Sequence, residues 1–504
     1  MSTTPARHAP LSKARTPLLA AMLCLGVAAG GAPSTALADA EKPNVLFIAV
    51  DDLRPQTAAH GDETVQTPHM DRLANSGRLF LHHHVQVPTC GASRYSLLSG
   101  QYPKRPPSLG NNAFNLYQQG HAPPSLPEWF RKHGYHTMQT GKISHSPDGF
   151  RDDRERIAAS GVENTYSRAP HLHFTNPEDH EVPGAWDAFD TPVGQWGTAW
   201  GAFFAYADGV TRVSGESPAI ESHDTTDEGY PDGLLADTAV AALTSLRDRG
   251  EPFFYAVGFY KPHLPFAAPQ KYWDLYDPEQ FDVSGLPLLR RRGGELFAGY
   301  SITPGDLQDD GSTARELIHG YHAVVSYVDA QIGRVLDALD ELGLTGNTIV
   351  VLWGDHGFHL GELGFWGKHT LHESSLASAF MMRVPGIAQP GHPTEAVIGS
   401  IDIYPTLVEL AGLPMPDHLD GTSFAETLRN PDADPVGFSA GFWGDRYTIR
   451  TSTHRLIDNL QDNSALFDHR NDPGETENIA EQHPETTVKL QGKIRELLER
   501  RKAR

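Results

Sequence analysis

The 504-residue sequence predicts an α/β fold: a large, mostly parallel sheet between helices, followed by a small C-terminal α+β subdomain. An amphipathic pattern over residues 317–342 predicts a long helix, with Gly343 as its stop. From about residue 435 the pattern changes to short alternating segments and a charged helix. Short, continuous apolar runs rich in β-forming residues are typical of strands buried on both faces, and the chain has three: 44–50, 253–258 and 348–353.

The remaining elements follow from local signals. Residues 125–134 predict a short helix capped by Ser125, and residues 403–411 predict another that ends at Gly412. Weak periodicity and many Gly, Pro and Asp residues predict long loops over 146–228. The C-terminal subdomain is expected to hold short antiparallel strands and a final helix, at 447–451, 454–457, 465–468 and 484–501.

Ionisable residues follow the predicted strands, at the sheet edge where α/β proteins build their sites. Asp51 and Asp52 end the first apolar run, and Asp355 and His356 follow the third. Adjacent carboxylates repel each other unless a cation lies between them, so these four residues predict a divalent metal site. Oxygen ligands favour Ca²⁺ or Mg²⁺ over zinc. The alternative is that the two neighbouring aspartates only cap a turn.

A second set of residues is cationic. Its members lie in short segments that contain Gly or Pro: Arg94, Lys142, His145, His263 and Lys368. Near a metal, such groups would hold a compact anion. For each of these residues taken singly, the alternative to a functional role is a role at the surface or in packing. The histidine run 82–84 is expected to serve packing, Trp366 to be either a sugar platform or a core residue, and His359, His369 and His372 to line the pocket mouth.

The bulk composition narrows the function classes. A formal net charge of −22 argues against nucleic acid or anionic lipid as the partner.

Residues 1–38 have a basic start, a short apolar stretch and a small-residue cleavage pattern, which predict a secretory signal peptide and no membrane anchor. The mature protein is then periplasmic or secreted. Removing residues 1–38 also removes Cys24, which leaves Cys90 as the one cysteine.

The surroundings of Cys90 carry a family resemblance. The segment "CGASR" over 90–94, followed by "LLSG", resembles the signature of type I sulfatases, although Ala92 stands where that signature usually has Pro. "NVLFIAVDDLRP", "GKISH", "FYAVGFYKPHLPF" and "VLWGDHGFHLGELGFWGKHT" resemble successive blocks of the iduronate-2-sulfatase branch. The resemblance implies an alkaline-phosphatase-like sandwich, with a catalytic domain over 39–434 and the C-terminal subdomain over 435–504.

The resemblance also implies a chemistry. In that family a formylglycine-generating enzyme oxidises the cysteine to Cα-formylglycine, whose hydrate attacks sulfur with one hydroxyl and expels sulfate with the other. Asp51, Asp52, Asp355 and His356, with the modified Cys90, would hold Ca²⁺, with Mg²⁺ as the alternative. The remaining roles are then as follows: Arg94 and Lys142 stabilise the nucleophile, His145 accepts the proton that triggers release, and His263 and Lys368 hold the sulfate, with His263 a candidate acid.

These residues predict an exported sulfatase that acts on a sulfated sugar or polysaccharide. Two alternatives stay open. One is a phosphodiester or phosphonate ester hydrolase of the same superfamily, which would share the metal and most of the cations. The other is a glycan-binding protein whose sulfatase fold has lost its activity.

Overall fold

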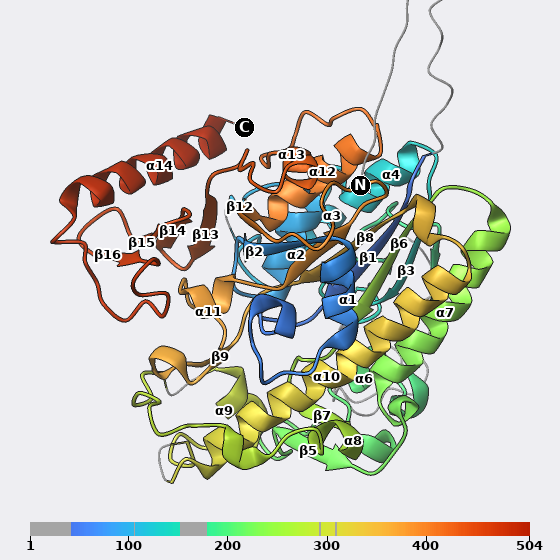
Figure 1. The fold of residues 1–504 in the computed structure, drawn as a ribbon, viewed down its shortest axis with the longest axis horizontal. Helices are drawn as coiled ribbons and strands as arrows, with labels where there is room; N and C mark the ends of the chain where they lie inside the picture. The colour runs from blue at the N-terminus through green and yellow to red at the C-terminus, as the bar shows by residue number, and fades with distance from the viewer. Residues whose placement is uncertain (1–41, 105, 152–178, 292–293, 308–309, 504) are drawn as a thin grey trace, which may run out of the picture. The chain divides into compact units, whose positions relative to one another are not determined.

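An eight-stranded sheet forms the centre of the fold (Figure 1). β11 runs antiparallel to both of its neighbours, and the other neighbouring pairs in this sheet are parallel. The predicted mostly parallel sheet is therefore confirmed. Across the sheet the strands are β12 (Thr394–Gly399), β2 (Arg78–His84), β11 (Phe380–Arg383), β8 (Thr348–Gly354), β1 (Asn44–Val50), β6 (Phe253–Phe259), β3 (His136–Gly141) and β4 (Ala188–Phe189).

The structure is a computed structural model. It describes residues 42–104, 106–151, 179–291, 294–307 and 310–503. The predicted signal peptide and the middle of the predicted long loops lie outside the described residues.

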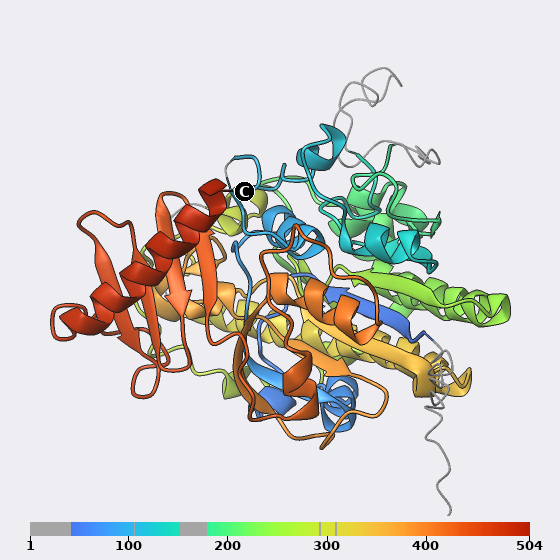
Figure 2. The ribbon, with the colours of Figure 1, turned by 90° about the horizontal axis from the view of Figure 1, so that it is seen from above.

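The central strand β1 explains the layered arrangement. Its side chains alternate between two cores: Leu46, Ile48 and Val50 enter one, and the residues between them enter the other. α1 (Pro68–Ser76), α7 (Pro231–Arg249) and α10 (Ser312–Glu341) supply the first core. α2 (Cys90–Ser99), α4 (Leu126–Lys132) and α12 (Ile403–Leu410) supply the second. Helices therefore cover both faces of the sheet (Figure 2).

The long helix and the shorter helices agree with the sequence signals. α10 ends two residues before Gly343, which has a φ of 71°. α4 begins after Ser125, whose side chain accepts a hydrogen bond from the Glu128 N–H while the Glu128 carboxylate accepts one from Ser125. These elements position the strands, because each packs an apolar face onto the sheet.

A second, four-stranded antiparallel sheet lies near the C-terminus, in the order β13 (Ser439–Trp443), β14 (Arg446–Arg450), β15 (His454–Asp458) and β16 (Ser464–Asp468). α14 (Pro484–Ala503) packs onto it through Leu490, Ile494 and Leu497. The predicted α+β subdomain is confirmed as a fold element. β13 was not predicted, because its sequence SAGFW contains a glycine and shows no alternation of apolar and polar residues.

Other differences also concern short or irregular elements. Four strands of the main sheet were not predicted from the sequence, because polar residues interrupt or closely follow their short apolar runs: β2, β3, β11 and β12. In its described parts, the predicted loop region 146–228 consists mainly of loops and turns, which β4, α6 (Ala199–Phe203) and β5 (Ile220–His223) interrupt. The loops are therefore less continuous than predicted. The remaining helices and strands are α3 (Asn115–Gln118), β7 (Phe266–Pro269), α8 (Gln270–Trp273), α9 (Glu295–Gly299), β9 (His359–Leu360), β10 (Trp366–Gly367), α11 (Glu373–Leu376) and α13 (Ala425–Arg429).

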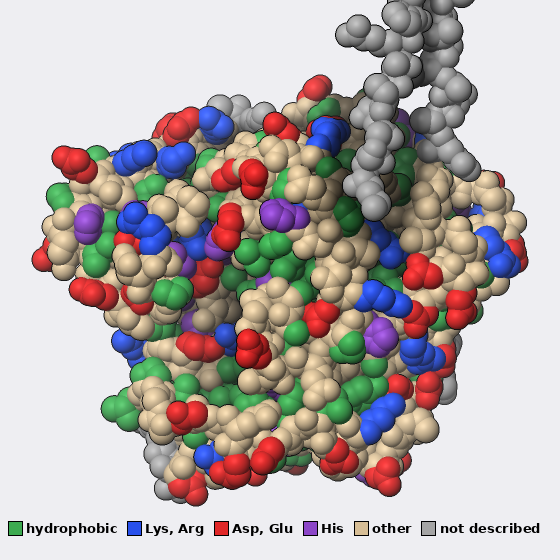
Figure 3. Space-filling model, viewed as in Figure 1, with side chains coloured by type: hydrophobic (Ala, Val, Ile, Leu, Met, Phe, Trp, Pro, Cys, Tyr) green, Lys and Arg blue, Asp and Glu red, His purple; other side chains and the backbone are tan. Residues whose placement is uncertain are grey.

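Charges of both signs are interspersed over the face shown in Figure 3. That face shows no continuous basic tract of the kind that binds nucleic acid. Among the described helices, none combines the length and the apolar character that a membrane span requires.

Candidate active site

The three predicted strand ends meet at one edge of the sheet. β1 pairs in parallel with β8 on one side and with β6 on the other. The segments that follow these strands therefore emerge together, as predicted. Asp51 and Asp52 come from β1, His263 follows β6, and Asp355 and His356 follow β8.

Cys90 is the first residue of α2, opposite this edge. The Asn111 side chain holds the helix start, because its Oδ1 accepts hydrogen bonds from the Gly91 N–H and the Thr89 hydroxyl, both at 3.0 Å. A Cβ at Gly91 would lie 2.5 Å from the Asn111 Cα, so only glycine fits there. Ala92 precedes the first intrahelical bond, which Ser93 donates to Thr89, so its own N–H needs no helical partner and proline at this position would cost no intrahelical hydrogen bond.

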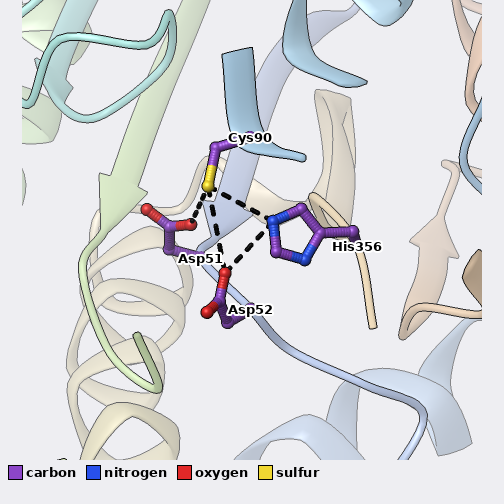
Figure 4. Close-up of side chains that lie close together, drawn as sticks. All are labelled: Asp51, Asp52, Cys90 and His356. Atoms are coloured by element: carbon purple, nitrogen blue, oxygen red, sulfur yellow. Dashed lines mark hydrogen bonds and ion pairs between the residues drawn. The ribbon is translucent and has the colours of Figure 1, made fainter. Parts of the chain in front are cut away.

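Four side chains converge on the Cys90 sulfur, and Figure 4 shows three of them, Asp51, Asp52 and His356. The Sγ lies 3.4 Å from Asp51 Oδ1, 3.2 Å from His356 Nε2 and 4.0 Å from Asp52 Oδ1. The Lys368 Nζ approaches it to 3.4 Å. All of these groups are buried. Burial and the Asp51 charge hold the pKa of the Cys90 thiol well above its ordinary value, so the thiol is neutral and a poor nucleophile.

Asp355 and Arg94 form a second layer of this cluster. Asp355 accepts hydrogen bonds from the Asp52 N–H at 2.9 Å and from Arg94 Nε at 2.8 Å. Arg94 also donates to the Lys142 carbonyl at 2.5 Å, which joins α2 to the end of β3. Asp52 has a φ of 60°, a left-handed conformation that aspartate tolerates. This turn aims the carboxylates of Asp51 and Asp52 at the same point.

Two buried lysines neutralise the aspartates. Lys142 pairs with Asp51, and Lys368 donates to Asp52 Oδ1 at 2.8 Å. Burial alone would raise the pKa of Asp51, but Lys142 and Arg94 hold it well below its ordinary value. Burial would lower the pKa of Lys368, yet Asp52 raises it well above the usual range. Both groups therefore stay charged at neutral pH.

The two predicted histidines border this cluster. His145 Nδ1 is buried with no hydrogen-bond partner among the described residues, and its ring packs edge-on against Trp200. Burial and the nearby Lys142 hold the pKa of His145 well below its ordinary value, so the ring is neutral. His263 Nδ1 lies 2.6 Å from the Leu264 carbonyl oxygen. Its Nε2 faces the carboxylate of Glu295.

A small pocket adjoins the cluster and is lined in part by Glu295, Trp366, Lys368 and His369. His369 lines this pocket, as expected. Trp366 lines it as well and also packs against the first hydrophobic core, so both of its predicted roles stay open. His359 and His372 are not among the lining residues: the first hydrogen-bonds Thr370, and the second hydrogen-bonds Glu475. The histidine run 82–84 makes structural contacts, with Glu395, Ser378 and Glu373.

Sequence reasoning missed two carboxylates near the site. Glu295 contacts two of the predicted cations, yet its segment contains no motif or strand end that could have indicated it. Glu181 accepts the Ser146 N–H at 2.8 Å and so fixes the loop that carries His145. Burial raises the pKa of Glu181 to about 7.

The donor set fits a hard divalent cation. Asp51, Asp52, Cys90 and His356 each offer a ligand atom, and these atoms lie within 4.8 Å of one another. Two of the four donors are carboxylates, and Asp355 lies directly behind them. Oxygen-rich sites of this kind suit Ca²⁺ or Mg²⁺. An aldehyde or its hydrate at residue 90 would present its oxygens to the same carboxylates and lysines that now surround the sulfur.

Comparison with known proteins decides the family. Residues 43–413 match the family model described as Sulfatase, which covers most of the chain. The chain belongs to the sulfatase family. It is therefore a sulfuric ester hydrolase. Residues 361–503 also match the model described as N-sulphoglucosamine sulphohydrolase, C-terminal.

Two curated relatives extend over most of this sulfatase. A sulfatase of Formosa agariphila is 30% identical over 469 residues, covering 88% of this chain and 84% of the relative. The mouse iduronate 2-sulfatase is 29% identical over 422 residues, covering 76% and 71%. The resemblance to the iduronate-2-sulfatase branch is thereby confirmed.

Solved structures confirm the alkaline-phosphatase-like fold of the sulfatase. One is a protein in complex with its substrate D-glucosamine-2-N,6-O-disulfate, with a TM-score of 0.66 at 20% identity, covering 92% of this chain and 99% of the other. Another is the phosphonate monoester hydrolase of Agrobacterium radiobacter, with a TM-score of 0.69 at 21% identity, covering 91% and 96%. At these identities the likeness establishes the fold alone.

Proposed function

We propose that this sulfatase is exported, that Cys90 is converted to Cα-formylglycine, and that the enzyme hydrolyses sulfate esters of a sulfated sugar or polysaccharide. The observation that carries the proposal is the convergence on one sulfur of Asp51, His356 and Lys368 beside a cavity. The mouse and human relatives named iduronate 2-sulfatase favour a sulfated uronic acid or related glycan. Export rests on the signal-peptide pattern of residues 1–38.

Asp51, Asp52, Asp355 and His356 would hold Ca²⁺ together with residue 90. When bound, the cation polarises the sulfate oxygens and the nucleophile. Formylglycine would take up one water to give two hydroxyl groups on one carbon, one for attack on sulfur and one whose deprotonation releases sulfate and restores the aldehyde.

The protein's own side chains then stabilise the negative charge that develops during the reaction and hold the sulfate group. Arg94 and Lys142 hold the negative charge that develops on the nucleophile. Lys368 and His263 bind sulfate oxygens, and His263 gives a proton to the alcohol oxygen as its bond to sulfur breaks. His145 accepts the proton whose removal triggers sulfate release, which its neutral, unpartnered Nδ1 allows.

The test is sulfate release by the parent and by C90A from a panel of sulfated monosaccharides and uronic-acid disaccharides. The parent is expected to release sulfate, and C90A only at the uncatalysed rate. S99A serves as the matched control, because Ser99 is buried on the same helix and bonds only the helix backbone at Ser96. Release by C90A at the parent's rate would contradict the covalent mechanism.

The phosphonate monoester hydrolase among the fold neighbours motivates a second arm. One preparation is assayed with 4-nitrophenyl sulfate and with 4-nitrophenyl phenylphosphonate. A higher kcat/KM on the sulfate ester supports the proposal, and a higher kcat/KM on the phosphonate supports the alternative. Glycan binding by a parent protein that releases no sulfate would support a binding role instead.

A further inference from the structure

Glu295 is a partly exposed carboxylate among the cations of the proposed sulfate site. Its Oε1 lies 3.5 Å from His263 Nε2, and its Oε2 lies 3.8 Å from Lys368 Nζ. Arg212 Nη1 lies 3.5 Å from the same Oε1. The Glu295 side chain is 27% exposed and lines the cavity, so it stands where a substrate would enter.

The contacts of His263 determine which of its nitrogens carry protons. A carbonyl oxygen only accepts hydrogen bonds, so the 2.6 Å contact with Leu264 places a proton on Nδ1. A neutral ring would then turn the Nε2 lone pair toward the Glu295 carboxylate, which is repulsive. A doubly protonated ring donates at both nitrogens. Phe203 packs against the ring with centroids 4.4 Å apart and fixes this orientation.

We propose that Glu295 is a positioning residue: its carboxylate keeps the His263 ring doubly protonated and holds Nε2–H at the pocket, where the leaving alcohol oxygen takes the place of Glu295 as the acceptor. The assignment rests on the proposed function. As the ester S–O bond breaks, its electron pair goes to the alcohol oxygen, and the Nε2 proton moves there. The products are the neutral alcohol and a neutral His263 ring that keeps its Nδ1 proton, and solvent restores the second proton before the next turnover.

Charged groups from several elements face this pair and act in both directions: Lys368 and Arg212 oppose a second proton on His263, whereas Asp51 favours it. Lys368 follows β10, Arg212 precedes β5, Tyr300 follows α9, and Asp51 interacts with His263 from the end of β1. Burial alone would raise the pKa of Glu295, but His263 and Lys368 hold it well below its ordinary value. Glu295 therefore stays ionised through the range in which sulfatase turnover is measured.

The first test uses leaving groups of different basicity. A sugar sulfate releases a basic alkoxide that needs the proton, whereas 4-nitrophenyl sulfate releases a stable phenolate. E295Q is expected to lower kcat on the sugar sulfate by on the order of 100-fold and on the aryl sulfate by less than about 3-fold. E279Q is the matched control, because Glu279 is an exposed carboxylate 3.7 Å from Arg315, and it should change neither rate. Equal losses on both esters in E295Q would overturn the assignment.

The second test needs no turnover. ¹⁵N NMR of histidine-labelled protein at pH 7.5, with H263Q to identify the resonances, reports the charge of the ring. The parent is expected to show both nitrogens protonated, and E295Q a neutral ring protonated at Nδ1. A neutral ring in the parent would overturn the assignment even if E295Q failed to fold.

The two tests separate this inference from the proposed function. A parent protein that hydrolyses neither ester contradicts the proposed function, while the ring charge still tests Glu295. A parent that hydrolyses both esters, combined with a ring whose charge is the same in E295Q, contradicts the role of Glu295 alone.

Discussion

The protein buries two clusters of ionised side chains, and they differ in what they surround. The Cys90 cluster consists of Asp51, Asp52, Arg94, Lys142, Asp355 and Lys368. The Arg455 cluster consists of Glu373, Arg450, Arg455 and Glu475, with His84 at its edge. The first surrounds a potential nucleophile beside a cavity. The second surrounds the guanidinium of Arg455, which contacts both carboxylates.

The Arg455 cluster joins the C-terminal sheet to the main sheet. Arg455 on β15 pairs with Glu373 on α11 and, through Nε at 2.6 Å, with Glu475 after β16. Glu373, His469 and Glu475 have the spacing of a metal site, but the arginines already balance their charge. Similar residue types therefore surround the proposed nucleophile in one region and form a structural connection in the other. The difference is whether the cations leave a reactive atom accessible.

Removing the central cation of the Arg455 cluster should have the largest effect on stability. R455M leaves two buried carboxylates without their shared partner, so the free energy of unfolding should fall by about 3–5 kcal/mol. Urea unfolding followed by circular dichroism measures it. kcat per folded molecule should not change. R470M is the control, because Arg470 is exposed and pairs only with Asp468. A loss below about 1 kcal/mol in R455M would show that the cluster is not a structural connection.

Removing a cation from the Cys90 cluster should affect catalysis instead. K142M deletes the ammonium that pairs with Asp51 but keeps a similar apolar stem above Phe203. kcat should fall by on the order of 10²–10³, which corresponds to about 2.7–4 kcal/mol of transition-state stabilisation. Steady-state kinetics on a sulfate ester measure it, with K132M on the exposed face of α4 as the control. If K142M stays within about 3-fold of the parent, Lys142 is not part of the catalytic machinery.

Added Ca²⁺ should distinguish the two clusters directly. At 100 times its Kd, a cation that binds only the folded state stabilises it by about 2.7 kcal/mol. The melting temperature of the parent, freed of metal with a chelator, should rise with CaCl₂. The rise should disappear in D52N and persist in E475Q. The reverse pattern would place the cation in the Arg455 cluster.

The smallest expected effect is a pH dependence at the edge of the Arg455 cluster. Burial, with Arg455 and Arg450, lowers the pKa of His84 to about 4, although Glu373 opposes the shift. The unfolded chain binds this proton below about pH 6.5, so the stability from neutral His84 is complete above pH 6.5 and is lost as the pH falls toward 4. Between pH 7 and pH 5 the parent should lose about 2 kcal/mol more than H84Q. Urea unfolding at both pH values tests this, and equal losses would contradict it.

The contrast also explains what the sequence could predict. The β1, β6 and β8 strands were predictable because each is a continuous apolar run, and the parallel arrangement places their following residues together. Asp51, Asp355 and His356 could be identified from that placement alone. Cys90 and the cations lie on helices and loops, so only the family resemblance could assign them.

Other features needed the three-dimensional structure. Glu295 and Glu373 act through contacts with residues far away in the chain, and no local pattern indicates such contacts. β2 was missed because it carries the histidine run 82–84, which packs against Glu395, Ser378 and Glu373. Contacts with residues elsewhere in the chain stabilise a polar strand of this kind, and no apolar alternation in its own sequence indicates it.

Mass spectrometry of the tryptic peptide 79–94, from protein made in its own host, tests the central claim most directly. The peptide contains Cys90 and ends at Arg94. A mass that matches an aldehyde or its hydrate at residue 90 is the result we expect. An unmodified thiol in preparations that release sulfate would contradict the proposed mechanism.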